Sequence, residues 1–154
     1  MATRRSVFFS FHFERDAWRA GQVRNCDVVS EKYSGKGRFL DKADWEKIKK
    51  KGDQATKNWI NDQLHGTSVT VVLIGAQTSE RKWVKYEVEE SDSRGNGLLG
   101  IRIHNVKDKD GNKDSKGKIP LCEKYEYPVY DWVDGNGREN IGDWIEQAAK
   151  AAGR

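Results

Sequence analysis

A tryptophan and a glutamate four residues apart, Trp83 and Glu87, are the first candidates for chemistry in this sequence. On a helix this spacing places both side chains on one face, with their β-carbons roughly 6 Å apart. A carboxylate beside an indole ring can lose part of its hydration, which raises its pKa and prepares it to stabilise positive charge. The plainer interpretation is an amphipathic helix in which Trp83 packs in the core and Glu87 stays in water. Spacing alone favours the plainer interpretation.

A second candidate group follows the first hydrophobic run of the chain. Ser10, Phe11, His12 and Phe13 combine a hydroxyl, an imidazole and two aromatic rings, which together could stack on and hydrogen-bond a ligand ring. In the alternative interpretation the two phenylalanines belong to the core and His12 caps the next helix. The residues alone favour this alternative.

Signals for metal, phosphate-loop and cysteine chemistry are weaker. Residues 108–114 resemble a calcium loop only superficially, because Lys113 stands in place of the turn glycine and Ile119 in place of the bidentate glutamate. We expect no metal site, because no ligand spacing joins the histidines and cysteines, His12, His65, His104, Cys26 and Cys122. Two cysteines do not make a disulfide scaffold, and neither has the local signature of a nucleophile, although that role stays open. The glycines of 95–97 precede a predicted strand, which is the wrong context for a phosphate loop.

Alternating strands and helices must position these candidates. Strands are predicted at 7–11, 69–74, 98–103 and, as a late edge strand, within 125–132, and helices at 14–23, 55–64, 78–93 and 141–152. The run 69–74 is almost continuously apolar, which is typical of a strand buried on both faces of a parallel sheet. We therefore predict an α/β fold of the flavodoxin-like or Toll/interleukin-1 receptor (TIR)-like class, with about five mostly parallel strands and helices on both faces.

Local signals add detail near the ends of the strands. Residues 10–13 and 75–83 both follow strands, so they should lie at the edge where open α/β sheets bind ligands. Thr78 and Ser79 are expected to cap the helix that carries Glu87, which would place Glu87 two turns, about 12 Å, inside it. Residues 27–29 could form a short strand, 30–44 reads as a long connection with two glycines, and 45–51 reads as a helical turn.

Length and composition exclude several classes of protein. The chain has 154 residues, which fits one domain, 1–154. Its 28 basic and 24 acidic residues are interspersed and give a net charge of +4, which argues against nucleic-acid binding. The apolar run Val71–Ile74 is too short to cross a bilayer, and no cleavage site follows the basic start 1–5, so we expect a cytoplasmic protein without a membrane partner. A phosphoreceiver is excluded because Ser10-Phe11-His12 and Ile74-Gly75 stand where its acidic residues belong.

An ordered set of motifs then carries a resemblance to a known family. The motifs are 7–13, Asp41 with Trp45, 67–78, 81–87, 100–101, 107–109 and 130–133, which together span most of the chain. This set resembles the TIR-like proteins of bacterial Thoeris anti-phage systems, of the ThsB type. The resemblance implies an enzyme that cleaves NAD⁺, as substrate rather than cofactor, at the nicotinamide–ribose bond. It also implies that the product is a cyclic ADP-ribose isomer, which activates a separate effector protein.

The resemblance assigns roles to particular residues. In TIR enzymes a Trp-Cys-x-x-Glu pattern carries the catalytic glutamate; here it reads Trp83-Val84-Lys85-Tyr86-Glu87, so Glu87 matches that glutamate and Val84 replaces the cysteine. The expected substrate-binding residues are Ser10, Phe11, His12, Asp41, Trp45 and Trp83. One carboxylate suffices, because nicotinamide leaves as a neutral molecule and needs no general acid, unlike the leaving group in ordinary glycoside hydrolysis.

Assembly and alternative functions stay open at this point. The long connection 30–44 is the candidate lid or assembly loop, but it lacks the Arg-Asp-x-x-Pro-Gly pattern of animal TIR assembly loops. TIR active sites are often completed by a neighbouring copy, so self-assembly is a possible requirement for activity. The competing hypothesis is a non-catalytic TIR scaffold that signals by self-association.

Overall fold

Five parallel strands form the centre of the computed structural model, which describes residues 4–121 and 124–154. Cys122 and the first three residues of the basic start therefore lie outside the described residues. The strands are β1 (Arg5–Ser10), β2 (Tyr33–Gly37), β3 (Val69–Ile74), β4 (Gly97–Arg102) and β5 (Val129–Asp131). They lie in the order β2-β1-β3-β4-β5, and every neighbouring pair is parallel. The predicted α/β fold is confirmed.

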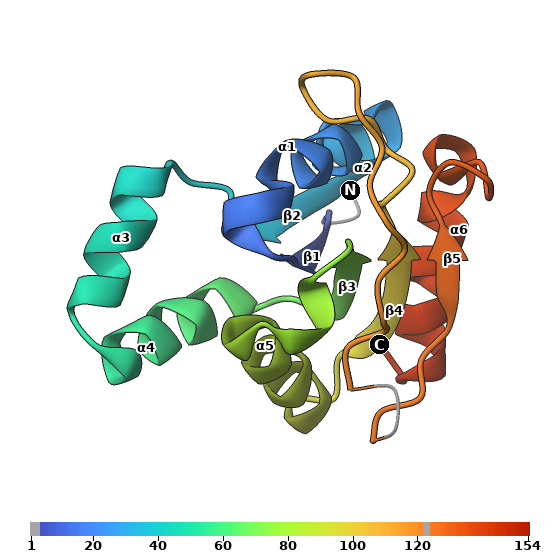
Figure 1. Cartoon of the computed structure of the whole chain (residues 1–154). Helices are drawn as coiled ribbons and strands as arrows, with labels where there is room; N and C mark the ends of the chain where they lie inside the picture. The colour runs from blue at the N-terminus through green and yellow to red at the C-terminus, as the bar shows by residue number, and fades with distance from the viewer. Residues whose placement is uncertain (1–3, 122–123) are drawn as a thin grey trace.

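Helices cover both faces of this sheet (Figure 1). They are α1 (Phe13–Arg24), α2 (Asp27–Lys32), α3 (Lys42–Lys50), α4 (Asp53–Leu64), α5 (Lys82–Ser93) and α6 (Gly137–Ala151), with a short 3₁₀ helix, η1 (Thr78–Glu80). Helices α1, α2 and α6 share a core with Val7 and Phe9 of β1, whereas α4 packs on Phe8 from the opposite face. Figure 1 shows α3 standing farthest from the sheet, joined to α4.

The alternation of side chains along the strands explains this layering. Successive residues of a strand point to opposite faces, so Phe8 and Phe9 belong to different cores. All six residues of β3 are buried, as its apolar run predicts for a strand covered on both sides. The sequence-predicted edge strand in 125–132 is also confirmed, although only Val129–Asp131 pair with β4.

The segment between α1 and α3 corrects two predictions. Residues 27–29 belong to helix α2 and not to a strand. Two adjacent valines are compatible with a helix or a strand, and here the packing of α2 on α6 favours the helix. The connection 30–44 is not structureless: it contains the edge strand β2 and the start of α3, which is a full helix rather than a turn. The sequence Tyr-Ser-Gly-Lys-Gly has low β propensity, so pairing with β1 creates this strand. Gly37 is required there, since it has φ 131° and an added β-carbon would lie 2.5 Å from the Phe9 carbonyl oxygen.

The start of α5 also differs from the prediction. Thr78 and Ser79 form η1 instead of capping α5, because the Thr78 hydroxyl accepts a hydrogen bond from the Gly75 amide at 2.8 Å. Helix α5 begins at Lys82, so Glu87 lies about 7.5 Å along it rather than 12 Å.

Within the described ranges, no helix combines the length and the apolar character needed to cross a membrane.

Candidate functional site

The Glu87 carboxylate is completely buried at the carboxyl edge of the sheet. Its Oε1 accepts hydrogen bonds from the Ser10 hydroxyl at 2.7 Å and from Arg38 Nη2 at 2.8 Å. Its Oε2 accepts no hydrogen bond from any described residue. Ser10 ends β1 and Arg38 follows β2, so two adjacent strands deliver donors to one carboxylate. The interpretation of Glu87 as a solvated residue is wrong.

Helical periodicity places Glu87 inside the protein. The buried residues of α5 are Val84, Glu87, Val88 and Ser91, which form one stripe at intervals of three and four. An ionised carboxylate in such a stripe is unfavourable unless charges and hydrogen bonds compensate it. Ser10 and Arg38 supply that compensation on one oxygen only.

The electrostatics of Glu87 combine opposing effects. Burial raises the pKa of this carboxyl, and the charge of Arg38 and the hydrogen bonds from Ser10 and Arg38 lower it. Burial is the larger effect, so the pKa lies above its usual value. The raised pKa therefore comes from burial in the α5 stripe, and not from contact with the Trp83 ring.

Arg38 is the functional residue that sequence reasoning missed. Its guanidinium is 3% exposed and also donates to the Phe11 carbonyl oxygen at 2.6 Å. The guanidinium carbon lies 5.2 Å from the centre of the Trp45 ring and 5.8 Å from that of Phe11. A buried carboxylate needs a cation nearby, so a basic partner could be expected. Because the sequence does not predict strand β2, nothing in it distinguishes Arg38 among the 28 basic residues as that partner.

An aromatic layer closes the site. Phe11 and Trp45 are almost fully buried, and Phe13 lies between them, with ring centres 6.5 Å from Phe11 and 6.0 Å from Trp45. Phe11 and Phe13 are therefore core residues, as the plainer interpretation of 10–13 holds. Phe11 and Trp45 also flank the Arg38 guanidinium, which brings these two predicted site residues to Glu87 through Arg38.

His12 stands at the N-cap position of α1, but its side chain makes no capping hydrogen bond. Its Nδ1 lies 3.4 Å from Glu14 Oε2. Burial and the positive charge of Arg81 lower the pKa of His12, so the imidazole is neutral at pH 7. A neutral imidazole can donate or accept a hydrogen bond without adding charge, but among the described residues no hydrogen bond or ion pair joins it to Glu87.

Asp41 and Trp83, like His12, lie outside the contacts that join Ser10, Arg38, Phe11 and Trp45 to Glu87. Asp41 is exposed and caps α3, its Oδ1 accepting from the Asp44 amide at 2.8 Å. Trp83 is half-buried and packs edge-on against Tyr86, with ring centres 5.9 Å apart. Among the described residues no hydrogen bond or ring contact joins either of them to Glu87.

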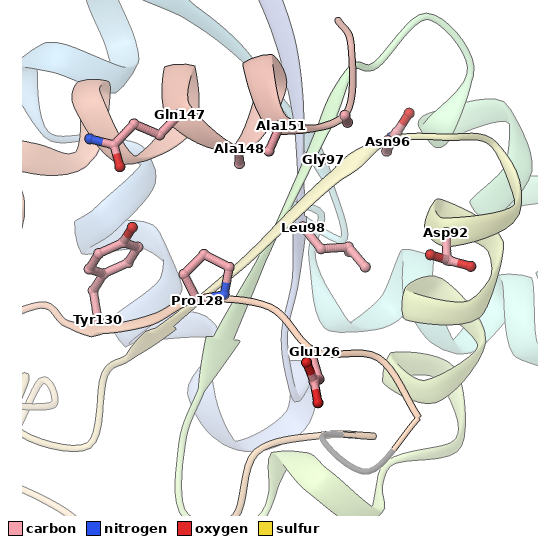
Figure 2. A pocket seen from close by; sticks show the side chains of 11 residues that line it. Asp92, Asn96, Gly97, Leu98, Glu126, Pro128, Tyr130, Gln147, Ala148 and Ala151 are labelled. Atoms are coloured by element: carbon pink, nitrogen blue, oxygen red, sulfur yellow. The ribbon is translucent and has the colours of Figure 1, made fainter.

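Other features of the surface do not coincide with this site. A hollow of about 390 Å³ lies between α6, the amino-terminal end of β4 and residues 126–130, and none of the predicted site residues lines it. Figure 2 shows the residues that line this hollow. In the 108–114 loop, Asp108 Oδ1 accepts from the amides of Asp110 and Asn112, so it serves a turn. Across residues 4–121 and 124–154, no three His, Cys, Asp or Glu side chains converge as a metal site would require.

Comparison with known proteins adds independent information about the same residues. Residues 8–108 match the family model of the Thoeris protein ThsB, TIR-like domain. ThsB1 of Bacillus cereus (strain MSX-D12), which carries the provisional name of a cyclic ADP-D-ribose synthase, is 43% identical over 142 residues. The match covers 86% of this chain and 73% of that relative. Ser10, Arg38 and Glu87 all lie inside the range that the family model matches.

Proposed function

The chain belongs to the Thoeris ThsB family of TIR-like proteins, and from this we propose that it cleaves NAD⁺ and closes the ADP-ribose into a cyclic isomer. One observation carries the proposal. Glu87 is a buried carboxylate with one oxygen held by Ser10 and Arg38 and the other without a hydrogen-bond partner among the described residues. Such a group is suited to stabilising a positively charged ribose in a site without water.

The proposed reaction needs one carboxylate. The bond between the ribose anomeric carbon and the nicotinamide nitrogen breaks, and its electron pair leaves with neutral nicotinamide. Glu87 stabilises the resulting oxocarbenium-like ribose, with Oε2 available for a ribose hydroxyl. A hydroxyl of the same ADP-ribose then attacks the anomeric carbon and loses its proton to solvent. NAD⁺ thus yields nicotinamide, a cyclic ADP-ribose isomer and one proton.

The aromatic surroundings support cyclisation over hydrolysis. Phe11 and Trp45 exclude water from the neighbourhood of Glu87, and a dry site lets an internal hydroxyl compete with solvent for the anomeric carbon. Trp83, on the same helix as Glu87, is the proposed stacking surface for a substrate ring. His12 and Asp41 complete the proposed substrate contacts.

The proposal also covers the biological setting. The product acts as the signal to a separate effector protein, which the enzyme itself does not contact. The protein works in the cytoplasm, where NAD⁺ is available. Self-association of copies, implied by the family resemblance, is part of the proposal for the active state.

Mass spectrometry of NAD⁺ incubated with the purified protein tests the reaction. We expect free nicotinamide and a product with the mass of ADP-ribose less one water, both absent in Glu87→Gln. Glu89→Gln is the matched control, since Glu89 is exposed on the same helix. Linear ADP-ribose would instead indicate a hydrolase. NAD⁺ that stays intact even in lysate of phage-infected cells would overturn the enzyme and favour the scaffold.

A further inference from the structure

The carboxylate on which the proposed chemistry depends is already occupied by a cation of the protein itself. Arg38 Nη2 lies 2.8 Å from Glu87 Oε1, and the two side chains are 3% and 0% exposed. Ser10, Phe11 and Trp45 around them are also 0–1% exposed. No substrate can contact Glu87 in this arrangement unless part of the wall moves.

The position of Arg38 matches the electrostatic demand of the proposed substrate. NAD⁺ presents a cationic nicotinamide riboside, and its cleavage places positive charge on the ribose. Two cations beside one buried carboxylate repel each other strongly, because little solvent screens them. The Arg38 guanidinium and the cationic end of the substrate therefore compete for Glu87.

We propose that Arg38 is a built-in plug: its guanidinium occupies the subsite of the cationic substrate group, and the protein becomes active when Arg38 leaves Glu87. This inference rests on the proposed NAD⁺ cleavage. According to this proposal, the ion pair between Arg38 and Glu87 keeps the site inactive.

The surroundings of Arg38 allow its guanidinium to move away from Glu87. Its guanidinium is held by two hydrogen-bonded acceptors, the Phe11 carbonyl and Glu87 Oε1, and its Nε has no partner among the described residues. Arg38 precedes α3, and α3 carries Trp45, one of the two rings beside the guanidinium. A transient displacement of α3, the helix farthest from the sheet in Figure 1, would open one wall of the Arg38 pocket. The return of α3 after substrate entry would close the site against water again.

The contacts of α3 with α1 and α4 show what must break. Trp45 packs on Phe13 of α1 and on Trp59 of α4, and Lys49 Nζ pairs with Glu14 Oε1 at 3.1 Å. The Lys49–Glu14 pair is half-exposed, and ion pairs of this kind contribute little to stability. The packing of Trp45 on Phe13 is therefore the stronger of the two contacts between α3 and α1.

The alternative role for Arg38 is positioning Glu87 throughout catalysis. The two roles predict opposite effects of Arg38→Gln in the protein of 154 residues. A plug predicts that carba-NAD⁺, an analogue that cannot be cleaved, binds about tenfold or more tightly to the variant than to the wild type in isothermal titration calorimetry. It also predicts that NAD⁺ turnover without any trigger rises by a similar factor.

Arg24→Gln is the matched control, because Arg24 stacks on Phe39 at 4.5 Å and makes no ion pair with Glu87. Arg38→Lys is the second variant if Arg38→Gln does not fold. A lysine cannot hold the Phe11 carbonyl and Glu87 with the same forked geometry, so carba-NAD⁺ should again bind more tightly than to the wild type.

Each outcome has one meaning. Unchanged or weaker carba-NAD⁺ binding in a folded Arg38 variant would overturn the plug and leave Arg38 as a positioning residue. Tighter binding together with faster cleavage would support both the plug and the enzyme. Tighter binding with no cleavage would support the plug and overturn the proposed reaction.

Discussion

The Ser10 hydroxyl is one of two groups, with Arg38, that favour the charged form of Glu87. Its hydrogen bond to Oε1 favours the ionised carboxylate and lowers the pKa of Glu87 against the effect of burial. We expect Ser10→Ala to raise this pKa further, to reduce NAD⁺ cleavage about tenfold and to lower the free energy of unfolding by about 1 kcal/mol. In a pH–rate profile the acid limb should move to higher pH.

Ser93→Ala is the control for Ser10→Ala, since Ser93 is exposed at the end of α5. An acid limb that stays in place in Ser10→Ala would show that Ser10 does not tune Glu87.

Asp16 is a second buried carboxylate with an imperfect environment. Neither of its oxygens accepts a hydrogen bond from a described residue, and its nearest cation, Arg19 Nη1, lies 3.5 Å away. Burial raises its pKa from 3.8 to about 6. Because the folded-state pKa is the higher one, the folded protein holds a proton between about pH 4 and 6 that the unfolded chain releases. The contribution of Asp16 to stability therefore falls as the pH rises through this window.

Asp16→Asn tests this linkage. The variant should be more stable than the wild type at pH 7 by about 3 kcal/mol, and the gain should vanish near pH 3, where Asp16 is protonated in both states. Urea unfolding at the two pH values measures the difference, with the exposed Asp62→Asn as control. A gain of equal size at both pH values would rule out the titration of Asp16 as its cause.

At the scale of single elements, Asp41 has two candidate roles that can be separated. It caps α3 through its side chain, and it is also a proposed substrate contact. Asp41→Ala should lower the free energy of unfolding by about 1 kcal/mol, whereas Asp41→Ser keeps a capping oxygen and should have little effect. We expect KM for NAD⁺ to rise in both, because each removes the carboxylate that is proposed to contact the substrate. An unchanged KM in Asp41→Ser would leave Asp41 with the capping role alone.

The elements also show what the sequence could and could not predict. Strands β1, β3 and β4 and helices α1, α4 and α6 have strong periodicity or apolar runs, and these signals survive in the fold. Strand β2 has no such signal, because it is an edge strand rich in glycine whose pairing with β1 depends on distant residues. Arg38 directly follows β2. Because the strand is not predicted from the sequence, the position of Arg38 beside Glu87 is not predicted either. Glu87 itself was identified from the resemblance, since spacing alone favours a solvated side chain.

At the scale of the whole molecule, charge is spread rather than concentrated. The chain has 28 basic and 24 acidic residues. Some of the basic side chains, among them Arg19 and Arg38, are buried in ion pairs and cannot bind an external polyanion. We expect fluorescence anisotropy to detect no binding to double-stranded DNA at low salt. Binding that weakens with salt at a slope of about −0.9 per phosphate contact would contradict this expectation.

The burial of Glu87 has a consequence for a cell that holds this protein. A site that no solvent or nucleotide reaches consumes nothing while it waits. If Arg38 governs access, the protein can be stockpiled without draining the nicotinamide nucleotide pool. The output of signal per copy would then depend on how often Arg38 leaves Glu87.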